Sequence, residues 1–120
     1  MLIIAITAQG NNGDAQVDAR FARAKQILLY DSDTDSYKEL DNSAAINSPH
    51  GSGPQAAGQV INSGATVVLT GHCGPNAFQT LQAGDIQIVL NVSGVVKDAV
   101  KAFLSGELKA ADGADVAGHW

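Results

Sequence analysis

Residues suited to metal and anion chemistry are concentrated in one short segment of this 120-residue chain, residues 70–76. The segment holds the only cysteine, Cys73, next to His72, and Gly74 and Pro75 follow. A thiolate and an imidazole can coordinate soft metal ions, and the free N–H groups of a helix start attract anions. The segment therefore predicts a ligand-binding turn between a strand and a helix. The alternative interpretation is a tight structural turn in which Cys73 is a small buried apolar side chain.

Further candidate residues lie elsewhere in the chain. The only two arginines, Arg20 and Arg23, flank Phe21 and would share one face of a helical turn. His50 lies in a loop rich in glycine and serine, residues 48–53. From residue 42 to residue 84 there is no Asp, Glu, Lys or Arg. An anionic ligand near this stretch meets few carboxylates, and more distant charges are screened over about 8–10 Å. The alternative is a well-covered core region with neutral polar edges.

The charge balance and the single cysteine exclude several classes of protein. Twelve acidic and seven basic residues give a net charge of −5, which argues against general binding of nucleic acids or anionic membranes. One cysteine cannot form an internal disulfide, nor a four-thiolate iron–sulfur or zinc site within one chain. The apolar opening, residues 1–6, lacks the basic flank of a signal peptide, and no apolar run is long enough to span a membrane. We expect a cytoplasmic protein.

Hydrophobic periodicity and turn residues predict five strands and three helices. The strands are expected at residues 2–7, 26–31, 36–40, 65–69 and 86–90. The first helix should open near Gly53, the second at Pro75 and the third after Gly94, and glycines 64, 84 and 106 should end them. In the third helix, the residues expected to face the sheet are Val96, Ala99, Val100, Phe103 and Leu104.

The order of these elements predicts an α/β fold: a ribonuclease H-like mixed five-stranded sheet with strand order 3-2-1-4-5 and helices on both faces. We expect one domain over residues 1–108 and a flexible C-terminal tail over residues 109–120. Strands one, three, four and five end at the same edge of such a sheet, so their loops should form one site. The candidate cofactor-binding residues at this edge are Asn11, Asn12, Arg20, Phe21, Arg23, His50, Gly51, Ser52, Gly53, Gly71, His72, Cys73, Gly74, Asn91 and Ser93. The candidate metal ligands among them are Cys73, His72 and His50.

Three kinds of chemistry fit these residues less well. A nuclease of this fold needs several carboxylates to hold two metal ions, whereas the edge offers mainly Asp14 and Asp18. A cysteine–histidine nucleophile is disfavoured because adjacent His72 and Cys73 on an extended segment point to opposite sides. The glycine-rich loops match neither a P-loop nor a dinucleotide-binding motif. We therefore predict no enzymatic activity and an edge that holds a polyanion containing soft metal, mainly through hydrogen-bond donors.

Over nearly its whole length the chain resembles the dinitrogenase iron–molybdenum cofactor biosynthesis family. The matching segments are the opening strand (residues 3–7), Arg20-Phe21-Ala22-Arg23-Ala24, Asn47, residues 71–77 and residues 81–86. Where the family usually has His-Phe-Gly-Arg-Ala, this chain has Arg20 in place of the histidine. No ligand role of that histidine can therefore be carried over. Within the family the chain is most similar to the orange-protein branch, including its ending Gly118-His119-Trp120.

The resemblance implies a ribonuclease H-like fold and a molybdenum–copper sulfide cluster, or another molybdenum or iron–sulfur cluster, held without the protein supplying most of its ligands. The leading hypothesis is non-enzymatic binding and carrying of an anionic metal–sulfur cluster, with proteins that donate or receive the cluster as partners. The alternative hypothesis is a regulatory module that binds an ATPase and has no permanent cofactor. Neither hypothesis involves nucleic acid or a membrane.

Overall fold

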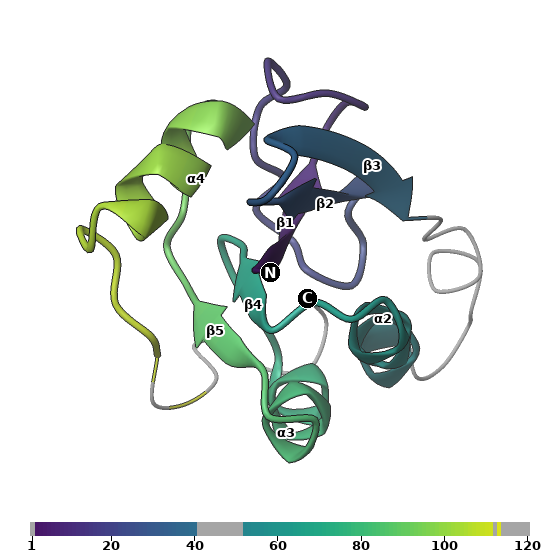
Figure 1. Ribbon diagram of the computed structural model, residues 1–120. Coiled ribbons are helices and arrows are strands. Elements are labelled where there is room, and N and C mark those ends of the chain that lie inside the picture. Colours follow the sequence, from purple (N-terminus) through teal and green to yellow (C-terminus); the bar gives the residue numbers. More distant parts are fainter. Residues whose placement is uncertain (1, 41–51, 112, 114–120) are drawn as a thin grey trace.

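Five strands form one mixed sheet in the order β3-β2-β1-β4-β5 in the computed structural model, which describes residues 2–40, 52–111 and 113 (Figure 1). The strands are β1 (Ile3–Ala8), β2 (Gln26–Asp31), β3 (Ser36–Leu40), β4 (Val67–Leu69) and β5 (Gln87–Val89). The predicted strand order is confirmed. The predicted fourth and fifth strands are each shorter than expected, because only three residue pairs join β4 to β5.

The central strand β1 pairs with β2 on one side and β4 on the other, antiparallel and parallel respectively. Its side chains alternate between two apolar cores. Ala5 faces the core that contains Ile27, Val68 and Ile88, whereas Ile4 and Ile6 face the opposite core. A strand covered on both faces needs apolar residues at nearly every position, which explains the continuous apolar run at the start of the chain.

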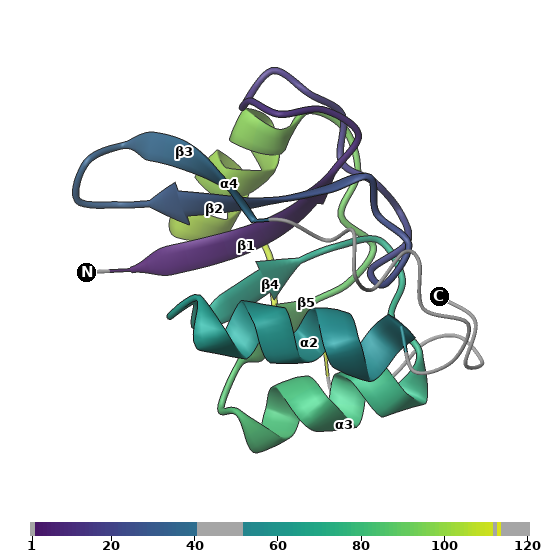
Figure 2. The same ribbon diagram turned by 90° about the vertical axis from the view of Figure 1, so that its right-hand side faces the viewer.

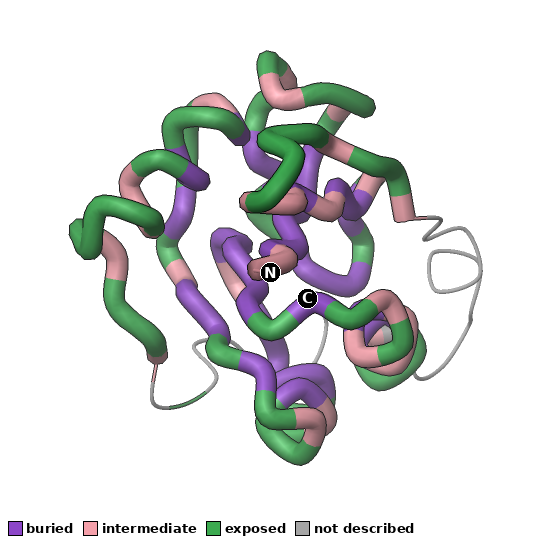
Figure 3. The backbone as a smooth tube through the Cα atoms, viewed as in Figure 1, coloured by how far each residue is buried: buried purple, intermediate pink, exposed green. Residues whose placement is uncertain are grey.

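Three helices cover the two faces of this sheet. They are α2 (Ser52–Asn62), α3 (Pro75–Ala83) and α4 (Val96–Leu104). Helices α2 and α3 lie side by side on one face and α4 lies on the other (Figure 2). Burial is concentrated in β1, β2, β4 and β5 and on the inward sides of the helices, whereas the residues of the edge strand β3 are exposed or intermediate (Figure 3).

One residue of the third helix departs from its predicted orientation. Val96, Ala99 and Val100 are buried and Phe103 packs against them, as the apolar spacing predicted. Leu104, which was also expected to face the sheet, is 48% exposed. Leu104 is the last residue of α4 and lies at the margin of its apolar stripe. The prediction for Leu104 was therefore wrong.

The register places the ends of four strands at one edge of the sheet. Ala8 at the end of β1 pairs with Gln26 at the start of β2, and Leu40 at the end of β3 pairs with Ile27. Leu69 at the end of β4 pairs with Val89 at the end of β5. We call this edge, with the loops that follow Ala8, Leu69 and Val89 and precede Gln26, the loop edge.

Some predictions concern residues that the structure does not describe. His50 and Gly51 of the candidate site and the ending His119-Trp120 lie outside the described residues. The boundary between a domain over residues 1–108 and a tail over residues 109–120 stays a prediction. Within that range, the Ala111 N–H donates to the Ile88 carbonyl oxygen on β5 at 2.7 Å. No helix in the described part of the chain is both long enough and apolar enough to cross a membrane.

Candidate functional site

Two chain segments that are distant in sequence run side by side at the loop edge. Arg20 and His72 form an isolated parallel β-bridge. The His72 N–H donates to the Ala19 carbonyl oxygen at 2.7 Å, and the Phe21 N–H donates to the His72 carbonyl oxygen at 3.2 Å. Gly71 makes this approach possible, because a Cβ there would lie 2.7 Å from the Ala19 Cα and 2.8 Å from its carbonyl oxygen.

This pairing also changes the expected arrangement of the arginines. A helical turn would have placed Arg20 and Arg23 on one face, but no helix forms there. Arg20 is extended because its backbone pairs with His72, and Arg23 lies in the turn that follows. Both arginines are exposed. The helical interpretation of this segment was wrong, and the two side chains reach the surface from different local structures.

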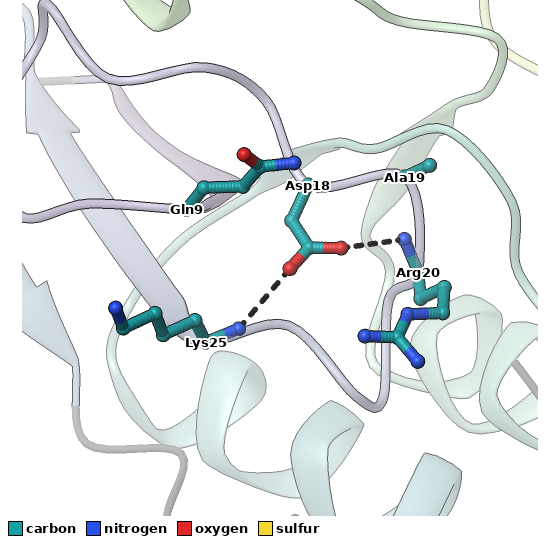
Figure 4. A pocket seen from close by; sticks show the side chains of 5 residues that line it. All are labelled: Gln9, Asp18, Ala19, Arg20 and Lys25. Carbon is teal, nitrogen blue, oxygen red and sulfur yellow. Dashed lines mark hydrogen bonds between the residues drawn. The ribbon is translucent and has the colours of Figure 1, made fainter.

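A pocket of about 520 Å³ opens beside this bridge (Figure 4). Its lining residues are Gln9, Asp18, Ala19, Arg20 and Lys25. Figure 4 shows the Asp18 carboxylate between the backbone nitrogens of Arg20 and Lys25, whose side chains lie on either side of it. Two exposed cations therefore flank one buried carboxylate, in a chain whose net charge is −5.

The loop before the pocket is attached to the start of α4. The Val96 N–H donates to the Ala15 carbonyl oxygen and the Lys97 N–H to the Gly13 carbonyl oxygen, both at 2.9 Å. The Lys97 Nζ also lies 2.6 Å from the Asp14 Oδ1. This hydrogen bond and the nearby Asp14 charge raise the pKa of Lys97. The first N–H groups of α4 are thus partnered by loop carbonyls.

The predicted residues of this loop are at the surface. Asn11 and Asn12 are exposed. The Asn12 side-chain oxygen accepts a hydrogen bond from the Asp14 N–H at 2.9 Å, which stabilises the turn. Neither asparagine lines the pocket of about 520 Å³.

Cys73 and Phe21 lie beneath the surface rather than at it. Both side chains are fully buried in the core on the α2 and α3 side of the sheet. The Cys73 Sγ lies 3.6 Å from the Gly74 carbonyl oxygen, which accepts its weak hydrogen bond. His72, the adjacent residue, is partly exposed. Among residues 2–40, 52–111 and 113, no group of three or more His, Cys, Asp or Glu side chains could hold a metal ion.

The remaining predicted residues are distributed around the same edge. The Asn91 N–H donates to the Gly71 carbonyl oxygen at 2.8 Å. Asn91 and Ser93 line a second pocket of about 220 Å³ with Asp98 and Leu108 of the α4 side. Gly74 is the buried residue that precedes α3. Ser52 and Gly53 begin α2, where a Cβ on residue 53 would lie 3.2 Å from the Ala77 Cβ.

The structure thus brings Arg20 and His72 together and separates Asn91 and Ser93 into another pocket. The sequence analysis did not select Gln9, Asp18 or Lys25 as binding residues. A usable signal existed for two of them, because Gln9 follows β1 and Lys25 precedes β2 at the loop edge. Asp18 was considered only as a carboxylate for metal ions, a role that does not match its contacts with backbone N–H groups.

Comparison with known proteins agrees with this architecture. A family model described as dinitrogenase iron-molybdenum cofactor matches residues 2–106. The solved apo form of the orange protein from Desulfovibrio gigas is 41% identical, with a TM-score of 0.93, and the match covers 97% of this chain and 98% of that chain. A putative NifB protein from Thermotoga is 29% identical, with a TM-score of 0.83, covering 98% of this chain and 100% of that one.

A more distant relative is an uncharacterized protein from Methanocaldococcus jannaschii. It is 22% identical over 96 residues, which are 78% of this chain and 81% of that protein. The two solved structures match almost the whole of both chains. The similarity therefore includes the loop edge as well as the sheet.

Proposed function

Because the chain belongs to the dinitrogenase iron–molybdenum cofactor family, we propose that it binds and carries an anionic metal–sulfur cluster at the loop edge, without catalysing a reaction. The observation that supports the proposal most directly is the pocket flanked by Arg20 and Lys25. Local positive charge attracts a polyanion even where the whole chain is acidic, because surface charges further away are screened. The similarity to orange proteins favours a molybdenum–copper sulfide cluster over other molybdenum or iron–sulfur clusters.

The side chains that line the pocket can hold such a cluster by donating hydrogen bonds to it. Arg20, Lys25 and Gln9 present guanidinium, ammonium and amide N–H groups around the pocket. A cluster assembled elsewhere already carries sulfide ligands on its metal ions. These sulfides can accept the hydrogen bonds of the pocket, so the protein need not supply most of the metal ligands. The buried Cys73 thiol is not at the pocket surface. Among the described residues, the candidate for direct contact with copper is His72, which is partly exposed and whose backbone is bridged to Arg20, although it is not one of the residues that line the pocket.

The contributions of single charges to binding are expected to be modest. An exposed ion pair contributes about 0.2–1 kcal/mol, and a charge-assisted hydrogen bond about 1.5–3 kcal/mol where water is excluded. Two cations and a few donors stay well short of the roughly 16 kcal/mol that picomolar affinity requires, so we expect weaker binding than that. Release to a recipient protein is compatible with binding of that strength, as a carrier requires.

A direct experiment tests the proposal. The protein is purified without added metal, and its visible spectrum and its molybdenum, copper and iron contents are measured. The apo protein is then titrated with tetrathiomolybdate, with and without copper(I), in equilibrium dialysis. We expect saturable binding at one site per chain and a visible absorption band that remains with the protein after gel filtration. Absence of binding under all of these conditions would contradict the proposal.

A second candidate function is a regulatory module that binds a protein such as an ATPase and has no permanent cofactor. The observation in its favour is the layer formed by α2 and α3, whose segments contain no Asp, Glu, Lys or Arg. The cores of protein interfaces are depleted in Lys, Glu and Asp. A protein that is free of metal and indifferent to tetrathiomolybdate, but that forms a stable complex with a purified ATPase, would favour this function.

A further inference from the structure

The proposed anion pocket contains a carboxylate in its wall, which requires an explanation. Asp18 lines the pocket, and its residue is only 7% exposed. A carboxylate close to an anionic ligand repels it, and more strongly in a less polar environment than in water. By its charge alone, Asp18 therefore weakens binding of the proposed ligand, and its presence in the pocket wall indicates a second role.

Both oxygens of this carboxylate are occupied by backbone donors of the two cationic residues. The Arg20 N–H donates to the Asp18 Oδ1 at 3.1 Å. The Lys25 N–H donates to the Asp18 Oδ2 at 3.2 Å. Figure 4 shows both hydrogen bonds, with the carboxylate between the two backbone nitrogens. One side chain thus closes the irregular loop from residue 18 to residue 25 at both ends.

The backbone of Asp18 is in turn joined to the sheet. Its N–H donates to the Thr7 carbonyl oxygen at 2.9 Å, and the Thr7 hydroxyl donates to the Asp18 carbonyl oxygen at 2.6 Å. The Thr7 hydroxyl also lies 2.8 Å from that of Thr70 at the end of β4. Both threonines are buried. Asp18 is therefore held to β1 and, through Thr7, to β4.

We infer that Asp18 is a positioning residue of the anion pocket: it joins the backbones of Arg20 and Lys25 to the sheet, so that both cations are held around one ligand. This inference rests on the proposed function of the pocket. If charge alone mattered, removal of the Asp18 carboxylate would strengthen anion binding; a positioning role predicts the opposite. Removing the negative charge of Asp18 should weaken anion binding, because an asparagine in its place has one acceptor oxygen for the two N–H groups and an NH2 group that opposes the second donor.

The test compares Asp18→Asn with Asp14→Asn. Both substitutions remove one carboxylate from the loop edge, but Asp14 is exposed, does not line the pocket, and its carboxylate pairs with the Lys97 side chain rather than with the backbone of Arg20 or Lys25. The probe is the tetrathiomolybdate dianion, titrated against the folded full-length protein. We expect affinity to fall about tenfold in Asp18→Asn and to stay equal or rise in Asp14→Asn. Equal or stronger binding by Asp18→Asn would overturn the inference.

A double-mutant cycle separates positioning from general loosening of the fold. Lys25→Gln removes the side-chain charge of Lys25 and keeps its backbone N–H. If Asp18 acts by positioning Lys25, the factor by which Lys25→Gln lowers the affinity should be about threefold smaller in the Asp18→Asn background than in the unaltered protein. Additive losses in the cycle would count against positioning.

Amide hydrogen exchange makes the inference independent of the proposed function. In Asp18→Asn at least one of the Arg20 and Lys25 amides should exchange about tenfold faster than in the unaltered protein, because asparagine has one acceptor oxygen for the two N–H groups, whereas β1 amides should not change. If the unaltered protein does not bind the probe, the proposed function fails and the exchange result alone decides the role of Asp18. Unchanged exchange at both amides would refute it. Asp18→Ser replaces Asp18→Asn if the latter does not fold.

Discussion

Arg20 and His72 pair as an isolated parallel bridge because Gly71 lets the backbone of Ala19 approach without a side chain between them. The bridge brings an arginine and a histidine of the loop edge together although they belong to different loops. Arg20 also lines the pocket together with Lys25.

Replacement of Gly71 by alanine should destabilise the protein by about 1–3 kcal/mol, because the new Cβ would overlap the backbone of Ala19. Urea unfolding measures the change. Gly58→Ala is the matched control, since a Cβ at this position within α2 meets nothing within 4 Å. That substitution should stabilise the protein by about 0.5–1 kcal/mol through helix propensity. Similar effects of the two substitutions would mean that Ala19 does not restrict residue 71.

The double substitution Arg20→Gln, Lys25→Gln should weaken tetrathiomolybdate binding at least about fivefold, because it removes both cations from the pocket. Equilibrium dialysis at two ionic strengths provides the measurement. Lys38→Gln, Lys101→Gln removes the same charge from exposed positions on β3 and α4. If the control variant loses as much affinity as the pocket variant, net charge and not the pocket governs binding.

Cys73→Ser should leave the absorption bands of a bound cluster nearly unchanged, because the thiol is fully buried beneath the loop edge. It should lower the free energy of unfolding by about 1–3 kcal/mol, since a hydroxyl replaces an apolar thiol in the core. Visible spectra and urea unfolding measure the two effects. Complete loss of colour in a folded Cys73→Ser protein would show that the thiol is an essential ligand.

The imidazoles provide the complementary test. A His50→Ala, His72→Ala variant should lose more affinity for copper(I)-containing cluster than Cys73→Ser does, because His72 is partly exposed next to Arg20. Metal content after gel filtration gives the comparison. If the histidine variant lost less affinity than Cys73→Ser, the direct contact with copper would belong to the thiol and not to the imidazoles.

Alkaline pH should weaken the β2–β3 hairpin through Tyr30. Its hydroxyl donates to the Asp35 Oδ1 at 2.7 Å, and this hydrogen bond, followed by burial and nearby negative charges, raises the pKa of Tyr30 above 10.0. A raised pKa means that the stabilisation is complete below pH 10.0 and is lost as the pH rises through the higher value of the folded state. Tyr30→Phe should remove this part of the pH dependence of unfolding. An unchanged alkaline profile in the variant would contradict the assignment to Tyr30.

Local sequence patterns were sufficient to predict the order of the elements. The apolar run that became β1 and the Gly-Pro start of α3 each depend on neighbouring residues only, so they can be recognised without tertiary contacts. The strand order followed because short connections and right-handed crossovers leave few arrangements. The margin of an apolar stripe was less certain from sequence, as the exposure of Leu104 shows.

The composition of the pocket was decided by tertiary structure. The sequence showed that Arg20, His72 and Cys73 belong to loops at one edge, but it did not show which of their side chains reach the surface. That depended on the approach of Ala19 to Gly71, which extends Arg20, and on the apolar core of the α2 and α3 side, which buries Cys73 and Phe21. The roles of Asp18 and Lys25 likewise come from hydrogen bonds across an irregular loop. Such contacts have no period along the chain, and only the folded backbone determines which donors and acceptors meet.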